Sequence, residues 1–123
     1  GKATDADKLP KLFWVNWFRK GTDGSFLWPG FGDNSRVLKW VLERVAGDAD
    51  ATETAIGRVP TAEALDTDGL DLDPATLDQL LQVDNEAWRG EIPLIEGHFE
   101  FIGEHLPAEL ADQLGALQKR LAG

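Results

Sequence analysis

The sequence contains no cysteine, methionine or tyrosine, and only two of its 123 residues are histidine. Without cysteine, the chain can form no disulfide framework, no thiolate nucleophile and no cysteine-ligated zinc site. No apolar run approaches the roughly 18 residues that a membrane-spanning helix needs, and the first residues do not resemble a signal peptide. These absences fit a cytoplasmic protein, which is the localisation that we expect.

Positive charge is also scarce: 12 Lys and Arg stand against 22 Asp and Glu, which gives a net charge of -10. This balance disfavours nucleic acid and anionic membranes as partners, because both require a basic face. The charge is uneven, however. Residues 1–40 hold seven basic and four acidic side chains with eight of the eleven aromatic ones, whereas residues 41–123 hold five basic and eighteen acidic. We therefore expect function to lie in the aromatic first third.

Local patterns predict an α+β fold, in which a short aromatic β-hairpin precedes a mainly helical segment. Residues 13–18 have the composition of a strand. The Asp-Gly pair in residues 21–24 is typical of a hairpin turn, and residues 25–28 are the expected returning strand. Residues 1–10 are expected to be a flexible leader, and residues 11–123 one folded portion of a domain.

Apolar residues at helical spacing predict the helices. The first starts at one of residues 33–35, each a possible N-cap, and ends at Gly47, with its buried stripe on Val37, Val41 and Val45. After it, residues 48–55 are predicted to be a loop and residues 56–60 a short edge strand.

The second helix is predicted to start at Asp73-Pro74 and to run beyond Trp88, because a cap followed by proline is a strong start signal. Asp84 is expected on its inward face. Gly90 and Pro93 are expected to break or kink this helix before residues 91–105 continue it. A last helix is predicted over residues 108–121.

Aromatic residues and glycines are concentrated between positions 17 and 34. The turn at Pro29-Gly30 is expected to let the rings of Phe26 and Phe31 approach, and the flanking glycines would admit backbone close to a ligand. Asn34 offers both a hydrogen-bond donor and an acceptor. Flat rings with one amide suit a planar heteroaromatic ligand, although composition alone favours a core that is aromatic by chance.

Other candidate sites are weak. His98 and His105 lie two helical turns apart, too far to share one metal ion, and are expected to be solvated. The acidic residues 66–73 lack the glycine and the final glutamate of a calcium loop, so we expect turn and capping carboxylates. Neither Ser25 nor Ser35 has a nearby histidine, and no GxxxxGK[ST] phosphate loop is present. The sequence thus predicts no catalytic residue and no metal ligand.

Two blocks carry a specific resemblance. Residues 15–20 (VNWFRK) and residues 26–38 (FLWPGFGDNSRVL) resemble the C-terminal part of GTP-dependent phosphoenolpyruvate carboxykinase. A weaker resemblance continues through residues 56–60 to residues 118–120. It implies that this chain is part of the larger α/β nucleotide-binding domain of a lyase. That enzyme converts oxaloacetate and GTP to phosphoenolpyruvate, carbon dioxide and GDP in gluconeogenesis.

The resemblance also implies a guanine pocket. Its seven nucleotide-binding residues would be Trp17, Phe18, Phe26, Phe31, Gly32, Asp33 and Asn34. Phe18 and Phe31 would stack on the base, while Trp17 and Phe26 would complete the walls. Asn34 would form a hydrogen bond with the guanine edge. This implication reverses the preference for an aromatic core.

The family's phosphate loop, catalytic lysine, manganese ligands and substrate arginines lie upstream of this segment. The resemblance therefore implies that Mn²⁺, and Mg²⁺ with the nucleotide, are held by residues outside this chain. Because the sequence has no methionine, we expect a processed or excised piece of a longer enzyme, which is expected to be a monomer. Because the catalytic and metal-binding residues lie outside this piece, we expect it to be inactive alone. We expect part of the aromatic region at residues 13–28 to be covered either by a second copy of the chain, through self-association, or by the rest of the enzyme.

Two other functions are compatible with the aromatic residues. The chain could be a protein-interaction module that uses its Trp and Phe side chains as a hot-spot patch and binds no nucleotide. It could also be an aromatic platform for a sugar or another flat apolar ligand, although no ring of polar side chains is evident that would grip hydroxyl groups.

Overall fold

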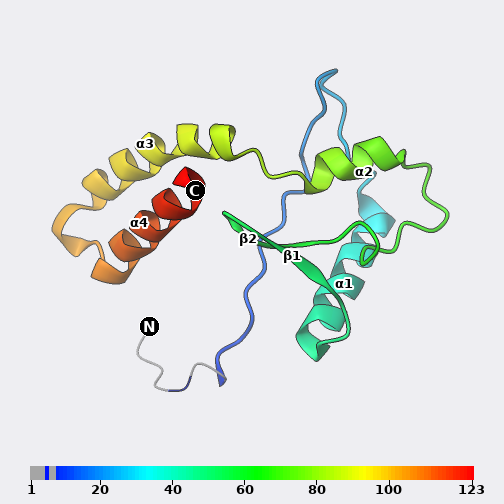
Figure 1. Cartoon of the computed structure of the whole chain (residues 1–123), viewed down its shortest axis with the longest axis horizontal. Coiled ribbons are helices and arrows are strands. Elements are labelled where there is room, and N and C mark those ends of the chain that lie inside the picture. Colours follow the sequence, from blue (N-terminus) through cyan, green and yellow to red (C-terminus); the bar gives the residue numbers. More distant parts are fainter. Residues whose placement is uncertain (1–4, 6–7) are drawn as a thin grey trace. The chain divides into compact units, whose positions relative to one another are not determined.

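The computed structural model describes residue 5 and residues 8–123, and its elements are shown in Figure 1. In chain order they are η2 (Phe31–Asp33), α1 (Asn34–Ala46), β1 (Ala51–Thr54), β2 (Gly57–Pro60), α2 (Pro74–Leu81), α3 (Asn85–Ile102), η3 (Gly103–His105) and α4 (Ala108–Ala122). These elements confirm the α+β class. They divide into two compact units, the first formed by the described part of residues 1–51 with residues 60–81, and the second by residues 52–59 and 82–123.

The strand predicted at residues 13–18 is not formed, and Trp17 and Phe18 lie in a turn instead. The physical reason is local: the side-chain Oδ1 of Asn16 accepts a hydrogen bond from the Phe18 backbone N–H at 3.0 Å. A side chain that bonds the backbone two residues on stabilises a turn at the expense of a strand. The aromatic hairpin is therefore much shorter than predicted.

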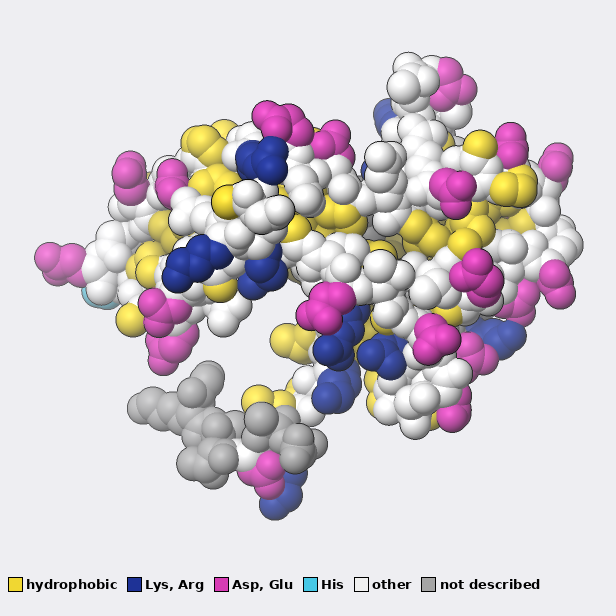
Figure 2. Space-filling model, viewed as in Figure 1, with side chains coloured by type: hydrophobic (Ala, Val, Ile, Leu, Met, Phe, Trp, Pro, Cys, Tyr) yellow, Lys and Arg dark blue, Asp and Glu magenta, His cyan; other side chains and the backbone are white. Residues whose placement is uncertain are grey.

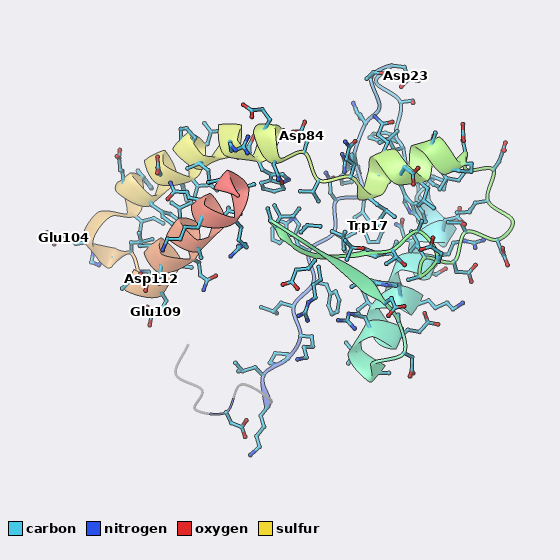
Figure 3. All side chains as sticks on the ribbon, in the orientation of Figure 1. Trp17, Asp23, Asp84, Glu104, Glu109 and Asp112 are labelled. Carbon is cyan, nitrogen blue, oxygen red and sulfur yellow. The ribbon has the colours of Figure 1, made fainter. Side chains whose placement is uncertain are left out.

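The predicted chain reversal is confirmed. Residues Lys20 and Phe26 form an isolated antiparallel bridge, and the Gly21 N–H donates to the Ser25 carbonyl at 2.9 Å. Asp23 lies at the tip of this turn (Figure 3), where its Oδ1 accepts from the Ser25 backbone N–H and hydroxyl. These bonds favour the charged carboxylate, so they lower the pKa of Asp23 below 3.8, the hydroxyl bond contributing most.

The regular sheet of the described residues is the pair β1–β2. Two residues join these strands, a length that permits only an antiparallel hairpin. The edge strand predicted at residues 56–60 is confirmed within one residue, but the predicted loop at residues 48–55 is wrong where β1 forms. The sequence of β1, Ala-Thr-Glu-Thr, has no alternating large apolar residues, so periodicity could not reveal it.

The helix boundaries at residues 82–93 also differ from the prediction. Asp84 is not on a helix face but is the N-cap of α3, where its Oδ1 accepts from the backbone N–H groups of Glu86 and Ala87 at 2.9 and 3.1 Å. The break therefore precedes α3, which continues through Gly90 and Pro93. The cap satisfies two backbone donors, whereas Pro93 removes one helical hydrogen bond.

A single aromatic-rich core holds the first unit together. Its buried members are Trp28, Trp40, Ala49, Leu65 and Leu77. The Trp40 indole N–H, which would be costly to bury without a partner, donates to the Asp50 carbonyl at 3.1 Å. Two of the three predicted stripe residues of α1, Val37 and Val41, pack against this core, but Val45 is exposed.

The second unit is built on the pairing of α3 with α4 (Figure 1). Leu121 of α4 and Ile92 of α3 are buried. The Arg89 guanidinium donates twice to the Leu121 carbonyl, at 2.9 and 2.7 Å, and so satisfies a backbone acceptor at the end of α4. These contacts place the last helix against the helix that Asp84 begins.

The cap at Asp84 gives the first testable prediction. Asp84→Ala should lower the free energy of unfolding by about 1 kcal/mol, because two N–H groups of α3 lose their acceptor. Asp84→Asn keeps a side-chain oxygen and should unfold close to the wild type. Urea denaturation followed by circular dichroism measures both variants. Equal stability of Asp84→Ala and the wild type would contradict the role of this cap.

Candidate functional site

The seven predicted site residues all lie in the first unit, between residue 17 and the start of α1. We refer to residues 17–34 as the aromatic segment. It contains no regular strand: its backbone hydrogen bonds are those of the chain reversal between residues 19 and 27 and of the short helix η2. The positions of its side chains are therefore decided mainly by which of them the core accepts.

Trp17 and Phe18 point to different environments. Trp17 is half-buried and packs against the core, on the side of α1 and α2 (Figure 3). Phe18 is 71% exposed. These two neighbours therefore differ in exposure, and they lie in a turn rather than in the predicted strand. Only the part of the Trp17 ring that remains exposed could form a wall of a binding site.

The aromatic rings of Phe18 and Phe26 form a pair. Their centroids are 6.1 Å apart at an interplanar angle of 61°, and Phe26 is 57% exposed. The Lys20 ammonium lies 5.2 Å from the centre of the Phe26 ring, a cation–π arrangement. The predicted approach of Phe26 to Phe31 is wrong, because the chain reversal at residues 21–24 brings Phe26 back to Phe18 instead.

Phe31 stands apart from the other rings. Its side chain is 96% exposed, and its backbone has a φ of 46°, next to Gly30 with a φ of 79°. A bulky residue in the left-handed region costs roughly 1–2 kcal/mol, and an exposed ring gains nothing from burial. Neither packing nor backbone preference explains a phenylalanine here. Outliers of this kind cluster at functional sites.

Asn34, the first residue of α1, is oriented by a core side chain. Its Oδ1 accepts a hydrogen bond from the indole N–H of Trp28 at 3.0 Å, and Trp28 is only 6% exposed. Among the described residues, no hydrogen bond is formed by the Asn34 amide nitrogen. Two N–H donors are therefore available on the side of the amide that faces away from Trp28.

Charged residues brace the start of α1. Asp33 precedes this helix, but its carboxylate forms no cap; its Oδ1 pairs with the Arg36 Nε at 3.1 Å. Arg36 also contacts Asp66 at 3.3 Å, and Lys39 contacts the same carboxylate at 2.8 Å. The network connects residue 33 of the aromatic segment to the loop that follows β2.

The Lys39–Asp66 pair shifts the titration of both groups. The hydrogen bond to the Lys39 ammonium lowers the pKa of Asp66 below 3.8, assisted by the Asp68 backbone N–H. The same hydrogen bond raises the pKa of Lys39 above 10.5. The Asp66 carboxylate is thus ionised at neutral pH and is compensated by Arg36 and Lys39.

The other candidate residues behave as predicted. His98 and His105 are exposed, and His98 stacks on Phe101. Asp73 accepts from the Ala75 N–H at the start of α2, as expected of a capping carboxylate. The described residues contain no group of three or more histidine or carboxylate side chains that could hold a metal ion. None of the described helices combines the length and apolar character needed to traverse a bilayer.

Trp28 and Arg36 belong to the site although the sequence pattern does not mark them. The pattern predicts only that Trp28 ends a strand and that Arg36 lies in the first helix. The signal for Trp28 is chemical: a tryptophan in an apolar environment requires an acceptor for its N–H, and Asn34 is the nearest side-chain amide toward the C-terminus. For Arg36, the signal is its position three residues after Asp33, a spacing at which helical side chains meet.

Comparison with known proteins identifies the class to which this domain belongs. Residues 1–120 match the model of the family described as phosphoenolpyruvate carboxykinase C-terminal P-loop domain. The chain belongs to this family.

The curated relatives of this chain are carboxykinases whose name includes GTP. The GTP-dependent phosphoenolpyruvate carboxykinase of Paenarthrobacter aurescens (strain TC1) is 52% identical over 115 residues, which are 94% of this chain and 19% of the relative. The enzyme of the same name from Treponema pallidum (strain Nichols) is 48% identical over 124 residues, 100% of this chain and 20% of the relative. The chain thus spans about a fifth of the length of the curated relatives that it matches.

The Lys39–Asp66 pair predicts a pH dependence of stability. A carboxylate whose pKa is lowered on folding contributes stability above its unfolded pKa, and this contribution is lost as the pH falls through the folded pKa. Between about pH 5 and pH 3, the wild type should therefore lose more stability than Asp66→Asn, measured by urea denaturation at low salt.

Asp71→Asn is the control for this prediction, because Asp71 forms no ion pair among the described residues. It should keep the full acid sensitivity of the wild type. If Asp66→Asn and Asp71→Asn lost stability with acid in parallel, the Asp66 ion pairs would not be the source.

Proposed function

We propose that this chain recognises the guanine base of GTP and GDP in a GTP-dependent phosphoenolpyruvate carboxykinase. The observation that carries the proposal is Phe31, a 96% exposed ring on a left-handed backbone at the start of η2. The free chain gains nothing from this arrangement, whereas a stacked base would cover the ring. Base–aromatic stacking contributes roughly 1–3 kcal/mol per base.

Other residues of the aromatic segment support a planar ligand with a polar edge. The pair Phe18–Phe26 offers further exposed aromatic surface in the same segment. Asn34 supplies the polar group, since its amide nitrogen is available while its oxygen is bonded to Trp28. Stacking discriminates poorly between bases, so the preference for guanine must come from hydrogen bonds to the base edge.

Gly32 and Asp33 complete the proposed binding loop. Gly32 has no side chain, and a Cβ added to it would meet no atom within 4 Å, so the backbone is open to a ligand at this position. The Gly32 carbonyl accepts from the Ser35 hydroxyl at 2.7 Å. Asp33 is held by Arg36, which fixes the loop against the first turn of α1.

The relatives' name supports the wider assignment. The GTP in that name favours nucleotide binding over a protein-interaction patch or a sugar platform. We propose that the whole enzyme is a lyase that converts oxaloacetate and GTP to phosphoenolpyruvate, carbon dioxide and GDP in the cytoplasm, during gluconeogenesis. The resemblance to the carboxykinases supports manganese binding by residues outside this chain.

Titration of the intrinsic tryptophan fluorescence with GDP and with ADP tests this function. Trp17 and Trp28 lie within the aromatic segment, so nucleotide binding should change their emission. We expect saturable quenching with higher affinity for GDP than for ADP, in this chain or in a longer carboxykinase that carries it. Equal responses to both nucleotides in the longer protein would contradict guanine recognition by this segment.

Phe31→Ala tests the stacking contact directly. It should weaken GDP binding by about 5- to 150-fold, the factor that corresponds to 1–3 kcal/mol of stacking. Stability should not fall, because the ring is exposed. Trp14→Ala is the matched control: Trp14 is 97% exposed but lies outside the aromatic segment, and its loss should leave affinity unchanged. Calorimetric titration in a full-length carboxykinase that carries this chain measures both variants; equal losses would refute a specific role for Phe31.

A further inference from the structure

Trp28 connects the core to the proposed base-recognition residue. Its side chain is buried in the cluster with Trp40, Ala49, Leu65 and Leu77, yet its one polar atom bonds the side chain of Asn34 at 3.0 Å. The indole of Trp40 in the same cluster bonds a backbone carbonyl, that of Asp50. Of these two buried indoles, only Trp28 therefore acts on a residue of the aromatic segment.

The chemistry of the two groups fixes the orientation of the Asn34 amide. An indole nitrogen can only donate, so the amide atom that it contacts must be the oxygen. If the amide were turned over, two donors would face each other and the buried indole N–H would lose its acceptor, which is unfavourable. The core position of Trp28 prevents the indole from moving away, so the NH₂ group of Asn34 is held toward the other side.

This orientation has a consequence for base preference. Guanine and hypoxanthine carry an acceptor oxygen at C6, whereas adenine carries an amino group there. An amide that presents donors can bond the oxygen but opposes the amino group. An amide that is free to turn over can present either its donors or its oxygen, and would therefore accept both kinds of purine.

We propose that Trp28 is a positioning residue that sets the purine preference, because it holds Asn34 with its donors toward a 6-oxopurine. Trp28 itself does not touch the nucleotide in this arrangement. The inference rests on the proposed function, since it requires Asn34 to meet the base edge. It adds to that function the group that selects between bases and the chemical class selected, a purine with an acceptor at C6.

Trp28→Phe tests the inference, with Trp40→Phe as the matched control. Both variants keep an aromatic ring in the same core cluster, and both lose one indole hydrogen bond. The ligands are inosine diphosphate and ADP, which differ in the base only at C6 and in the hydrogen at N1. Both affinities are measured by calorimetric titration in a full-length carboxykinase that carries this chain.

In the wild type, inosine diphosphate should bind more tightly than ADP. In Trp28→Phe this affinity ratio should fall by about tenfold, the effect of one hydrogen bond to a polar group. In Trp40→Phe the ratio should equal that of the wild type, although urea denaturation should show a comparable loss of stability. An unchanged ratio in Trp28→Phe, or equal falls in both variants, overturns the inference.

A second variant keeps the test decisive if Trp28→Phe fails to fold. Asn34→Asp preserves an acceptor for the Trp28 indole but replaces the outward donors with an acceptor oxygen, so the ratio should shift toward ADP. An unchanged ratio overturns the inference. The proposed function fails separately if the wild type shows no preference for GDP over ADP. If that preference is present but the affinity ratio is unchanged in Trp28→Phe, the proposed function stands and the inference is overturned.

Discussion

The burial of Trp28 is the constraint on which the aromatic segment depends. Residues 11–30 form one isolated bridge and no regular strand, and the backbone hydrogen bonds between them are confined to residues 19–27. Leu27 and Trp28 are buried instead, and burial of large apolar side chains stabilises by roughly 1.5–3 kcal/mol each. The side chain that secures the segment to the core is thus also the donor that orients Asn34. The stability of the first unit and the geometry of the proposed site therefore both depend on the position of Trp28.

The sequence predicts the parts of the fold that repeat with a helical period or begin with a recognisable cap. Helices α1 and α4 appear close to their expected limits, and α2 starts at Pro74 as predicted. The failures have local causes that periodicity does not capture. Asn16 bonds the backbone and prevents a strand, Asp84 caps a helix instead of facing its core, and the small polar residues of β1 carry no strand signal.

The candidate site shows a different limit. Residue types identify an aromatic segment suited to a planar ligand, but they do not show which rings the core will take, since the hydrophobic effect favours burial of them all. The structure buries Trp28 and half-buries Trp17, and it leaves Phe18, Phe26 and Phe31 exposed. Polar atoms help to decide which of these aromatic side chains are buried. The buried Trp28 has an acceptor in Asn34, a pairing between residues six apart that no periodic pattern reveals.

Electrostatics must also allow an anionic nucleotide to approach a chain of net charge -10. Two carboxylates that contact the first turns of α1 do not oppose this approach as free charges. Asp33 is paired with Arg36, and Asp66 with both Arg36 and Lys39, so each is compensated within 3.3 Å. Lys20 adds a positive charge over the Phe26 ring. The remaining excess of acidic residues lies beyond residue 40, and Figure 2 shows many Asp and Glu side chains on the surface of the helices. The segregation of charge along the sequence therefore leaves the aromatic segment locally favourable for a phosphorylated ligand, which the overall composition alone would disfavour.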